Sequence, residues 1–236
     1  MNELRLVALS CTHQVRAGDD LVEIFLSALN GSSCTLEDRD VVVVTSKVVA
    51  KAEGRVVNFD GTDEHKAAIV EGEAVRVLRR RGTLRITETR HGFVNANAGV
   101  DLSNTDAGTA VLLPLDPDRS ARAFRDALRY RLDVDVAVVV TDTFGRVWRH
   151  GVTDVALGCA GVSPLLDLRG TLDGNGRPLE ATEVAIVDEI AGAANLVLKK
   201  AAGTPFALVR GLDPSFFGAG SVKDSIVRSP TDDLFR

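Results

Sequence analysis

The sequence predicts a mixed α/β or α+β fold that forms one unit. Two apolar runs rich in β-branched residues, 41–44 and 134–140, are typical of strands buried on both faces of a sheet. Segments with apolar residues at helical spacing alternate irregularly with short strand-like segments. No repeat of 20–50 residues and no low-complexity linker divides the chain. We therefore expect a single compact domain.

The N-terminal segment predicts a strand, a helix and a second strand. Residues 4–9 alternate as a strand does, and residues 41–44 form the first fully apolar strand. Between them, apolar residues recur at helical spacing: Leu21, Ile24, Phe25, Ala28 and Leu29. Gly18-Asp19-Asp20 predicts the N-terminal cap of this helix, and Asn30-Gly31 predicts its end.

The middle of the chain predicts one long helix and several short strands. Residues 65–81 fit a helix whose basic end, Arg79-Arg80-Arg81, would face the negative end of the helix dipole before Gly82. Three short strands are expected near 83–88, 92–97 and 109–113.

The C-terminal half predicts a further helix, strands and a second helix. Pro114 and Pro117 indicate a loop, after which Ser120 would cap a helix. The apolar face of that helix consists of Ala121, Phe124, Leu128 and Leu132. The remaining elements are expected in this order: strands at 134–140 and 153–160, a turn at 172–178, a helix at 182–200, a strand at 206–209, and a loop-rich tail from 215.

Composition narrows the classes of function. The 236 residues are 45% hydrophobic and 26% charged, with a formal net charge of −5. A nucleic-acid backbone is not expected as the main partner, because phosphate binding favours a basic surface. Cys11, Cys34 and Cys159 are too few and too scattered for a disulfide framework, so reduced thiols are expected. With no signal peptide and no apolar run long enough for a bilayer, we expect a cytoplasmic protein without a membrane partner.

The most specific polar segment follows the second apolar strand. Val140 is followed by Thr141-Asp142-Thr143, which places a carboxylate and hydroxyls where the strand ends. Hard cations such as Mg²⁺ and Mn²⁺ prefer oxygen ligands of this kind and also bind phosphate oxygens. Arg146 and Arg149 follow directly and supply donors for anions. The alternative is that Asp142 only caps a turn.

Two further segments are rich in polar groups. Residues 97–104 form a turn of small residues that carries Asp101, Ser103 and Asn104. Residues 45–55 follow the first apolar strand and carry a hydroxyl and two ammonium groups that suit phosphates: Ser46, Lys47 and Lys51. The alternatives are an Asx-rich surface turn for the first segment and solvated lysines at a strand end for the second.

Several common sites are missing. The sequence contains no GxxxxGK[ST] loop, no GxGxxG after a strand, no HExxH and no GxSxG, and its four histidines have no ligand spacing. Asp188 and Glu189 are adjacent on the predicted late helix, so their side chains point about 100° apart. They are secondary candidates, or capping and solvating groups.

Five strings, taken together and in order, resemble the coenzyme F420-0:L-glutamate ligase family. They are VVVVTSKVVAKAEGR (41–55), VNANAGVDLSNT (94–105), TDTFGRVWRHGVTDVALG (141–158), TEVAIVDEIAGAANLV (182–197) and ALVRGL (207–212). GDDL at 18–21, LLPLDPDRSA at 112–121 and the final Asp232-Asp233-Leu234-Phe235 extend the resemblance to the N-terminal half of the bifunctional actinobacterial ligases.

The resemblance implies both an activity and an architecture. Such enzymes use GTP, with release of GDP and phosphate, to add L-glutamate through a γ-linkage to coenzyme F420-0. They require Mg²⁺ or Mn²⁺, are homodimers, and fold as two closely packed α/β subdomains with mixed sheets. We accordingly expect residues 1–236 to form a single ligase domain without the nitroreductase-like C-terminal half of the bifunctional relatives.

Functional positions of the family fall on matching residues of this chain. Its metal-binding positions fall on Asp101, Asp142 and Thr143. Its nucleotide contacts fall on Ser46, Lys47, Lys51 and Asn104. We hypothesise that Asp101 and Asp142 hold the metal. Lys51, together with Arg146 or Arg149 as catalytic residues, would orient phosphates or the acidic groups of the substrates.

The chain departs from the family pattern in two loops. Cys11-Thr12-His13 stands where relatives often have Gly-Leu-Pro, and residues 199–204 lack the glycine-rich loop with an acidic metal ligand that archaeal relatives carry. We carry over no ligand from either loop. Two alternative functions stay open: a related nucleotide- and metal-dependent ligase with a different acceptor, and a non-catalytic module that binds the deazaflavin.

Overall fold

The computed structural model of the chain describes residues 3–103, 105–199 and 203–234. Its centre is a five-stranded sheet in the order β1-β12-β2-β8-β9. The strands span Arg5–Leu9 (β1), Phe206–Arg210 (β12), Val41–Thr45 (β2), Ala137–Gly145 (β8) and Val152–Ala160 (β9). Only β2 and β8 pair in parallel, and the other neighbours are antiparallel. The two predicted apolar strands thus lie side by side in a mixed sheet.

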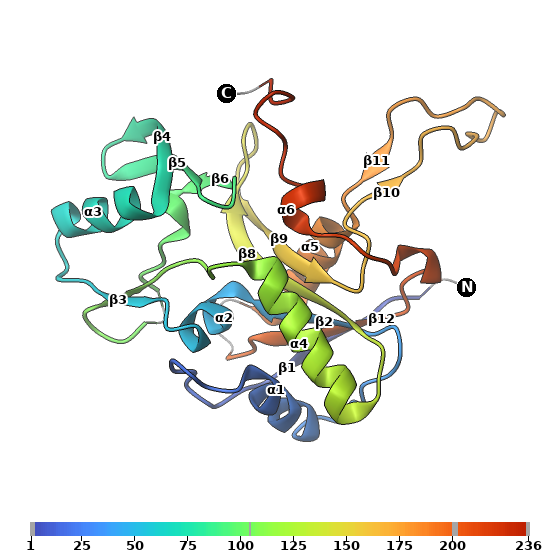
Figure 1. Ribbon diagram of the computed structural model, residues 1–236, viewed down its shortest axis with the longest axis horizontal. Coiled ribbons are helices and arrows are strands. Elements are labelled where there is room, and N and C mark those ends of the chain that lie inside the picture. Colours follow the sequence, from blue (N-terminus) through green and yellow to red (C-terminus); the bar gives the residue numbers. More distant parts are fainter. Residues whose placement is uncertain (1–2, 104, 200–202, 235–236) are drawn as a thin grey trace.

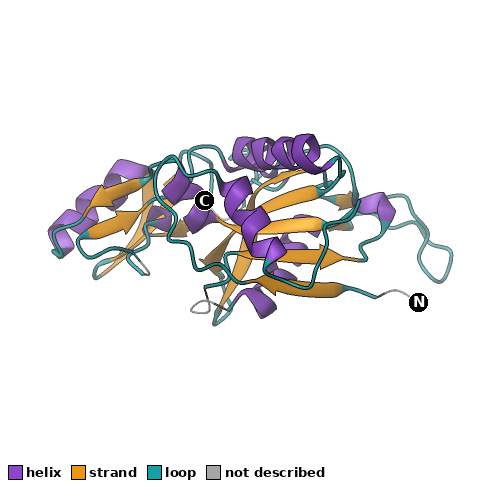
Figure 2. Cartoon of the chain, turned by 90° about the horizontal axis from the view of Figure 1, so that it is seen from below, coloured by secondary structure: helices purple, strands orange, loops and turns teal. Residues whose placement is uncertain are grey.

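Helices cover both faces of this sheet (Figure 2). Along β2 the side chains alternate, so that Val41 and Val43 pack in one buried cluster and Val42 and Val44 pack in another. The first cluster includes α5 (Ile186–Leu198), and the second includes α1 (Leu21–Asn30) and α4 (Pro117–Leu132). Because both faces are covered, a continuous apolar run is what this strand requires.

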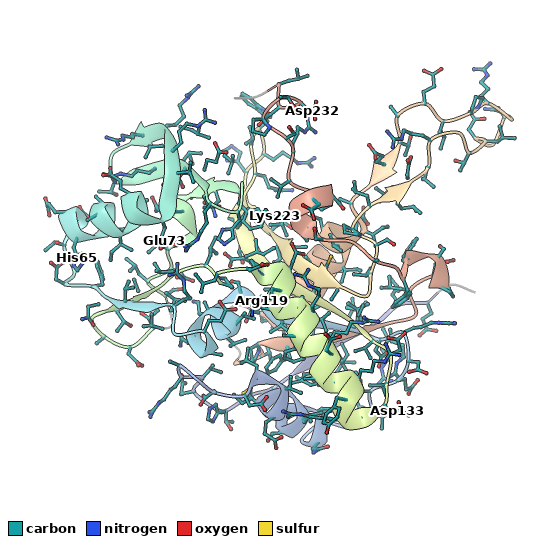
Figure 3. All side chains as sticks on the ribbon, viewed as in Figure 1. His65, Glu73, Arg119, Asp133, Lys223 and Asp232 are labelled. Atoms are coloured by element: carbon teal, nitrogen blue, oxygen red, sulfur yellow. The ribbon has the colours of Figure 1, made fainter. Side chains whose placement is uncertain are left out.

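A smaller part of the molecule lies to one side of the central sheet (Figure 1). Its antiparallel sheet is β4 (Ala74–Arg81), β5 (Leu84–Thr89) and β6 (Val94–Ala96), with α3 (Asp63–Glu73) beside it. The link to the central part consists of β3 (Val56–Asn58) paired with β7 (Thr109–Val111), and of the short turn η1 (Asn97–Gly99). Glu73 also joins the two parts, because it accepts hydrogen bonds from Arg55 at 2.6 Å and Arg90 at 2.7 Å (Figure 3). The mixed fold class is confirmed.

The predicted helix 65–81 is wrong in its second half. The helix α3 ends at Glu73, and Ala74–Arg81 forms β4, which pairs with β5. Only Val70 is buried on α3, so little packing would hold a longer helix. The arginine triplet therefore lies on a strand, where Arg80 is the register partner of Arg85. Pairing with the adjacent strand β5 determines the conformation of residues 74–81, and helical periodicity in the sequence did not reveal this hairpin.

Two other helix starts also differ from prediction. The cap of α4 is Asp116, whose carboxylate accepts a hydrogen bond from the Arg119 amide at 2.9 Å, and Pro117 occupies the first turn. Ser120 instead donates to Glu53 at 2.5 Å. The late helix begins at Ile186 because β11 (Glu183–Val184) pairs with β10 (Leu166–Asp167).

The remaining elements are short. A seven-residue helix, α2 (Ser46–Ala52), follows β2 and was not predicted. The tail contains a 3₁₀ turn, η2 (Pro214–Phe216), and a four-residue helix, α6 (Val222–Ser225). The three cysteines are free, as expected. Within the described ranges, no helix is both long and apolar enough to cross a membrane.

Candidate functional site

A cavity of about 570 Å³ lies at the ends of β2 and β8. Parallel strands present their carboxyl ends at the same edge of a sheet, and open α/β sheets bind ligands there. In the register of this pair Thr45 lies opposite Thr141, so the next residues, Ser46 and Asp142, emerge together. The Ser46 side chain hydrogen-bonds Asp142. The pairing of two distant apolar strands therefore brings two predicted site residues into contact.

Asp101 reaches the cavity from the smaller part of the molecule. Its backbone forms a β-bridge with Val111, with N–H···O distances of 2.9 Å in both directions. The turn before it requires Gly99, because a Cβ at that position would lie 2.6 Å from Leu113 and the φ angle is +71°. The Asp101 carboxylate accepts a hydrogen bond from the Ser103 amide at 2.7 Å. Residues 97–101 thus form a constrained turn that fixes one carboxylate.

Lys47 links this turn to the central sheet. Its ammonium lies 2.7 Å from the Asp101 carboxylate and donates to the Ser103 carbonyl at 2.6 Å. Lys47 lies on α2, directly after β2, so the contact joins segments 54 residues apart. In this structure the ammonium neutralises the carboxylate that the sequence predicted as a metal ligand.

The two aspartates have opposite electrostatic environments. Burial raises the pKa of Asp142 to about 7, against hydrogen bonds from Thr143 and Ser46, and the charges of Asp101 and Asp154 raise it further. For Asp101, burial would raise the pKa, but Lys47 and the hydrogen bonds from Ser103 outweigh burial and lower it. Burial thus disfavours the charged form of Asp142, whereas Lys47 and Ser103 stabilise the charged form of Asp101.

Asp154 is a cavity residue that the sequence interpretation missed. It lies on β9 directly opposite Thr143 of β8 and is only 6% exposed. Its carboxylate accepts a hydrogen bond from the Thr143 hydroxyl at 2.7 Å. The available signal was an aspartate within an otherwise apolar β segment, between Thr153 and Val155. That signal has meaning only once β8 and β9 are known to pair.

Most of the predicted site residues converge. The cavity is lined by six of them: Ser46, Lys47, Lys51, Asp101, Asp142 and Thr143. Asn104 lies outside the described residues. Cys11 and His13, from the loop that departs from the family pattern, line the cavity as well.

Arg146 and Arg149 are not among the cavity-lining residues. They lie on the exposed connection between β8 and β9, where Arg146 donates to the His150 carbonyl at 2.7 Å. Four residues of extended chain separate Arg146 from Asp142, which is about 13 Å. In the described part of the chain the cavity contains no arginine, and its basic groups are Lys47, Lys51, Lys199 and His13. A catalytic role for the two arginines stays a prediction.

Asp188 also lies outside the cavity lining. Its carboxylate accepts a hydrogen bond from the Ala156 amide of β9 at 2.9 Å. Burial raises its pKa. Its contact is that of a structural group that fastens α5 to the sheet.

The donor set suits a divalent cation that arrives with phosphates. Among the described residues, no group of three or more His, Cys, Asp or Glu side chains is arranged to hold an ion alone. Mg²⁺ is usually held by one or two carboxylates together with water and substrate phosphates. Asp101 and Asp142 provide such carboxylates, because both line the cavity. The residues therefore fit a metal–nucleotide complex better than a free ion.

Comparisons with known proteins identify the family. A family model described as F420-0:Gamma-glutamyl ligase matches residues 11–211. A coenzyme F420:L-glutamate ligase of Methanopyrus kandleri is 41% identical over 99% of this chain and 98% of the relative. Proteins of the same name from Methanothermobacter thermautotrophicus and Haloarcula marismortui are each 37% identical, over 94% and 99% of this chain and 94% and 96% of the relatives. The chain therefore belongs to the F420-0:gamma-glutamyl ligase family of enzymes.

Proposed function

We propose that the protein is a GTP- and divalent-metal-dependent ligase that adds L-glutamate, through a γ-linkage, to coenzyme F420-0. The observation that carries the proposal is the convergence of Asp101 and Asp142, from separate parts of the fold, on one cavity with three lysines. The relatives that are 36–41% identical are named for glutamate ligation to coenzyme F420, which supports the same acceptor here.

Binding of the triphosphate would depend on lysines at the ends of the central strands. Lys47 and Lys51 lie one helical turn apart on α2 and both line the cavity. Ammonium groups act as point charges toward phosphate oxygens. Ser46 supplies a hydroxyl beside them. Guanine recognition is assigned to no residue, because no contact in the cavity distinguishes GTP from ATP.

Asp101, Asp142 and Thr143 would hold the Mg²⁺ or Mn²⁺ ion. When bound, the ion would screen the phosphates and neutralise charge that develops on the transferred phosphoryl group. By holding the ion, the carboxylates would keep the triphosphate in one orientation. A cation beside Asp142 would offset the cost that burial places on its charged form.

Ligation in this cavity would proceed in two chemical steps. A carboxylate oxygen of the acceptor attacks the γ-phosphorus of GTP, and GDP leaves, which gives an acyl phosphate. The amine of L-glutamate then attacks the carbonyl carbon, loses a proton, and phosphate leaves as the amide bond forms. The contribution of the chain is to orient the anionic reactants and to neutralise their charges with lysines.

Mass spectrometry of the reaction product tests the proposal. The protein is incubated with F420-0, L-glutamate, Mn²⁺ and either GTP or ATP. We expect the acceptor to gain one or more glutamates with GTP, and Asp142→Asn to lower the rate at least about 100-fold, as loss of a metal-orienting group does. The matched control is Asp188→Asn, a half-buried carboxylate outside the cavity. Absence of product with the wild type, or full activity of Asp142→Asn, would overturn the proposal.

A second acceptor is favoured by one observation. Cys11 and His13 line the cavity, and they belong to the loop that departs from the family pattern. A related ligase with a different acceptor would leave F420-0 unchanged and would turn over GTP only when its own acceptor is present. The same assay with other carboxylate acceptors separates the two ligases. A protein that binds the deazaflavin without GTP turnover would be the non-catalytic module.

We also propose that the protein is a homodimer, on the resemblance to its family. Light scattering after size-exclusion chromatography measures the mass directly. Twice the chain mass of 25.1 kDa is expected, and a mass of 25.1 kDa would contradict this proposal.

A further inference from the structure

We propose that Asp154 is a positioning residue, which fixes the hydroxyl of Thr143 so that its oxygen faces the divalent cation of the metal–nucleotide complex. The inference rests on the proposed function only in taking a metal–nucleotide complex as the ligand. It adds a carboxylate from a third strand segment to the site, and it assigns to that carboxylate a role distinct from metal ligation.

The cross-strand geometry carries the first step. Thr143 and Asp154 are direct register partners on β8 and β9, and both line the cavity. The Thr143 hydroxyl donates its single proton to Asp154 at 2.7 Å. A hydroxyl that has donated its proton keeps both lone pairs for a cation or a donor. Without this acceptor the hydroxyl could rotate and present its proton to the cation instead.

The charge of Asp154 carries the second step. The carboxylate is only 6% exposed and lines the cavity together with Asp101 and Asp142. Three carboxylates therefore face one region of the cavity. Hard divalent cations prefer such oxygen ligands, so this arrangement favours a bound cation.

An independent observation also points to a ligand at this place. The Thr141 hydroxyl lines the same cavity, is 1% exposed, and has no hydrogen-bond partner among the described residues. Buried hydroxyls in folded proteins are nearly always hydrogen-bonded. Thr141 lies next to a register shift between β8 and β9, and such irregularities are frequent beside active sites. Its unpartnered hydroxyl therefore leaves a hydrogen-bonding position for a polar ligand in the cavity.

The test measures metal binding in the presence of GDP. Mn²⁺ affinity is followed by electron paramagnetic resonance for the wild type, Asp154→Ala, Thr143→Val and the double variant. We expect Asp154→Ala to weaken Mn²⁺ binding about 10–100-fold, the loss typical of groups that orient a metal ligand. GDP affinity without metal should stay unchanged. In the Thr143→Val background, Asp154→Ala should cause little further loss of Mn²⁺ affinity, because both substitutions remove the same hydrogen bond between Thr143 and Asp154.

Two further variants, Asp154→Asn and Asp188→Asn, distinguish a positioning role of Asp154 from a role in folding. Asp154→Asn keeps an oxygen that can accept from Thr143, so it should retain more Mn²⁺ affinity than Asp154→Ala. The control is Asp188→Asn, a half-buried carboxylate that accepts a hydrogen bond from the same strand β9, and this variant should bind Mn²⁺ as the wild type does. Thermal unfolding is recorded for every variant. A lower melting temperature with unchanged Mn²⁺ affinity would show a purely structural role and overturn the inference.

Two outcomes distinguish this inference from the proposed function. Additive losses in the double-variant cycle would overturn the positioning role while leaving glutamate ligation intact. If instead the wild type binds Mn²⁺ with GDP and shows the expected cycle, but adds no glutamate to F420-0, the proposed function fails and the role of Asp154 stands.

Discussion

A carboxylate lies beside each end of β2, and the two environments differ. At the N-terminal end, Asp40 is fully buried and Arg210 binds it through two contacts of 2.7 Å. Beside the C-terminal end, half-buried Asp142 of β8 has no such arginine partner among the described residues, and burial raises its pKa to about 7. Both aspartates flank apolar strands in the sequence. Both edges of this sheet therefore carry a charge. The functional edge differs from the structural edge in that its charge is not compensated by any arginine that the structure describes.

The largest effect that tests this comparison is expected at Asp142, in the pH dependence of the free energy of unfolding. Its folded pKa of about 7 exceeds the ordinary value of 3.8, so the folded state binds more protons between these pH values. The stability contribution of Asp142 is therefore complete below pH about 4 and is lost as the pH rises through about 7. In Asp142→Asn this loss is absent.

Unfolding by urea in EDTA at several pH values measures that difference. From pH 4 to pH 8 the wild type should lose up to about 4 kcal/mol relative to Asp142→Asn, since one pKa unit corresponds to about 1.4 kcal/mol. Addition of Mn²⁺ and GDP at pH 8 should reduce the gap, because a ligand of the folded state stabilises it. A gap that does not change with pH would mean that Asp142 is compensated like Asp40.

The smaller sheet shows how much of the fold could be predicted from the sequence. Strands β2 and β8 were predicted because both of their faces are covered, which demands continuous apolar runs. In β4 the burial is only partial, so its residues have no clear period of two and fit a helix as well. Helix α2 was missed because its valines also suit a strand. Local pattern is informative where packing is complete.

The site was predictable to a similar extent. The sequence indicated Ser46 and Asp142 because each is a polar residue shortly after an apolar run. The strand itself does not require a polar side chain at that place. Their contact depends on the parallel pairing of β2 and β8, which joins segments almost 100 residues apart and leaves no local signal. Asp154 was missed because its place in the cavity follows only from the pairing of β9 with β8. Arg146 and Arg149 were expected beside Asp142, but the extended β8 carries them away from the cavity.

At the compensated end of β2, the expected effect is a loss of stability. Replacing Asp40 by Ala removes the bidentate partner of Arg210 and leaves a partly buried guanidinium that only Glu37 contacts as an ion pair. We expect the free energy of unfolding to fall by about 3 kcal/mol, as when one partner of a buried pair is removed. Metal-dependent GDP binding should not change.

The matched control is Glu71→Ala, which removes an exposed partner of Arg80 and Arg85 on the smaller sheet. Exposed ion pairs contribute about 0–1 kcal/mol, so this variant should unfold almost as the wild type does. Equal losses for Asp40→Ala and Glu71→Ala would show that burial does not separate the two classes of ion pair.

The smallest effect concerns a carboxylate whose partner is a backbone amide. Asp116 caps α4 by accepting from the Arg119 amide, so Asp116→Ala should lower the free energy of unfolding by about 1 kcal/mol. Its charge is near water, and no other fold element depends on it, so the loss should stay well below that at Asp40. Ser120→Ala is the comparison, since Ser120 lies inside the helix and bonds Glu53. If Ser120→Ala cost more than Asp116→Ala, the helix would be held by its side-chain contact to α2 and not by its cap.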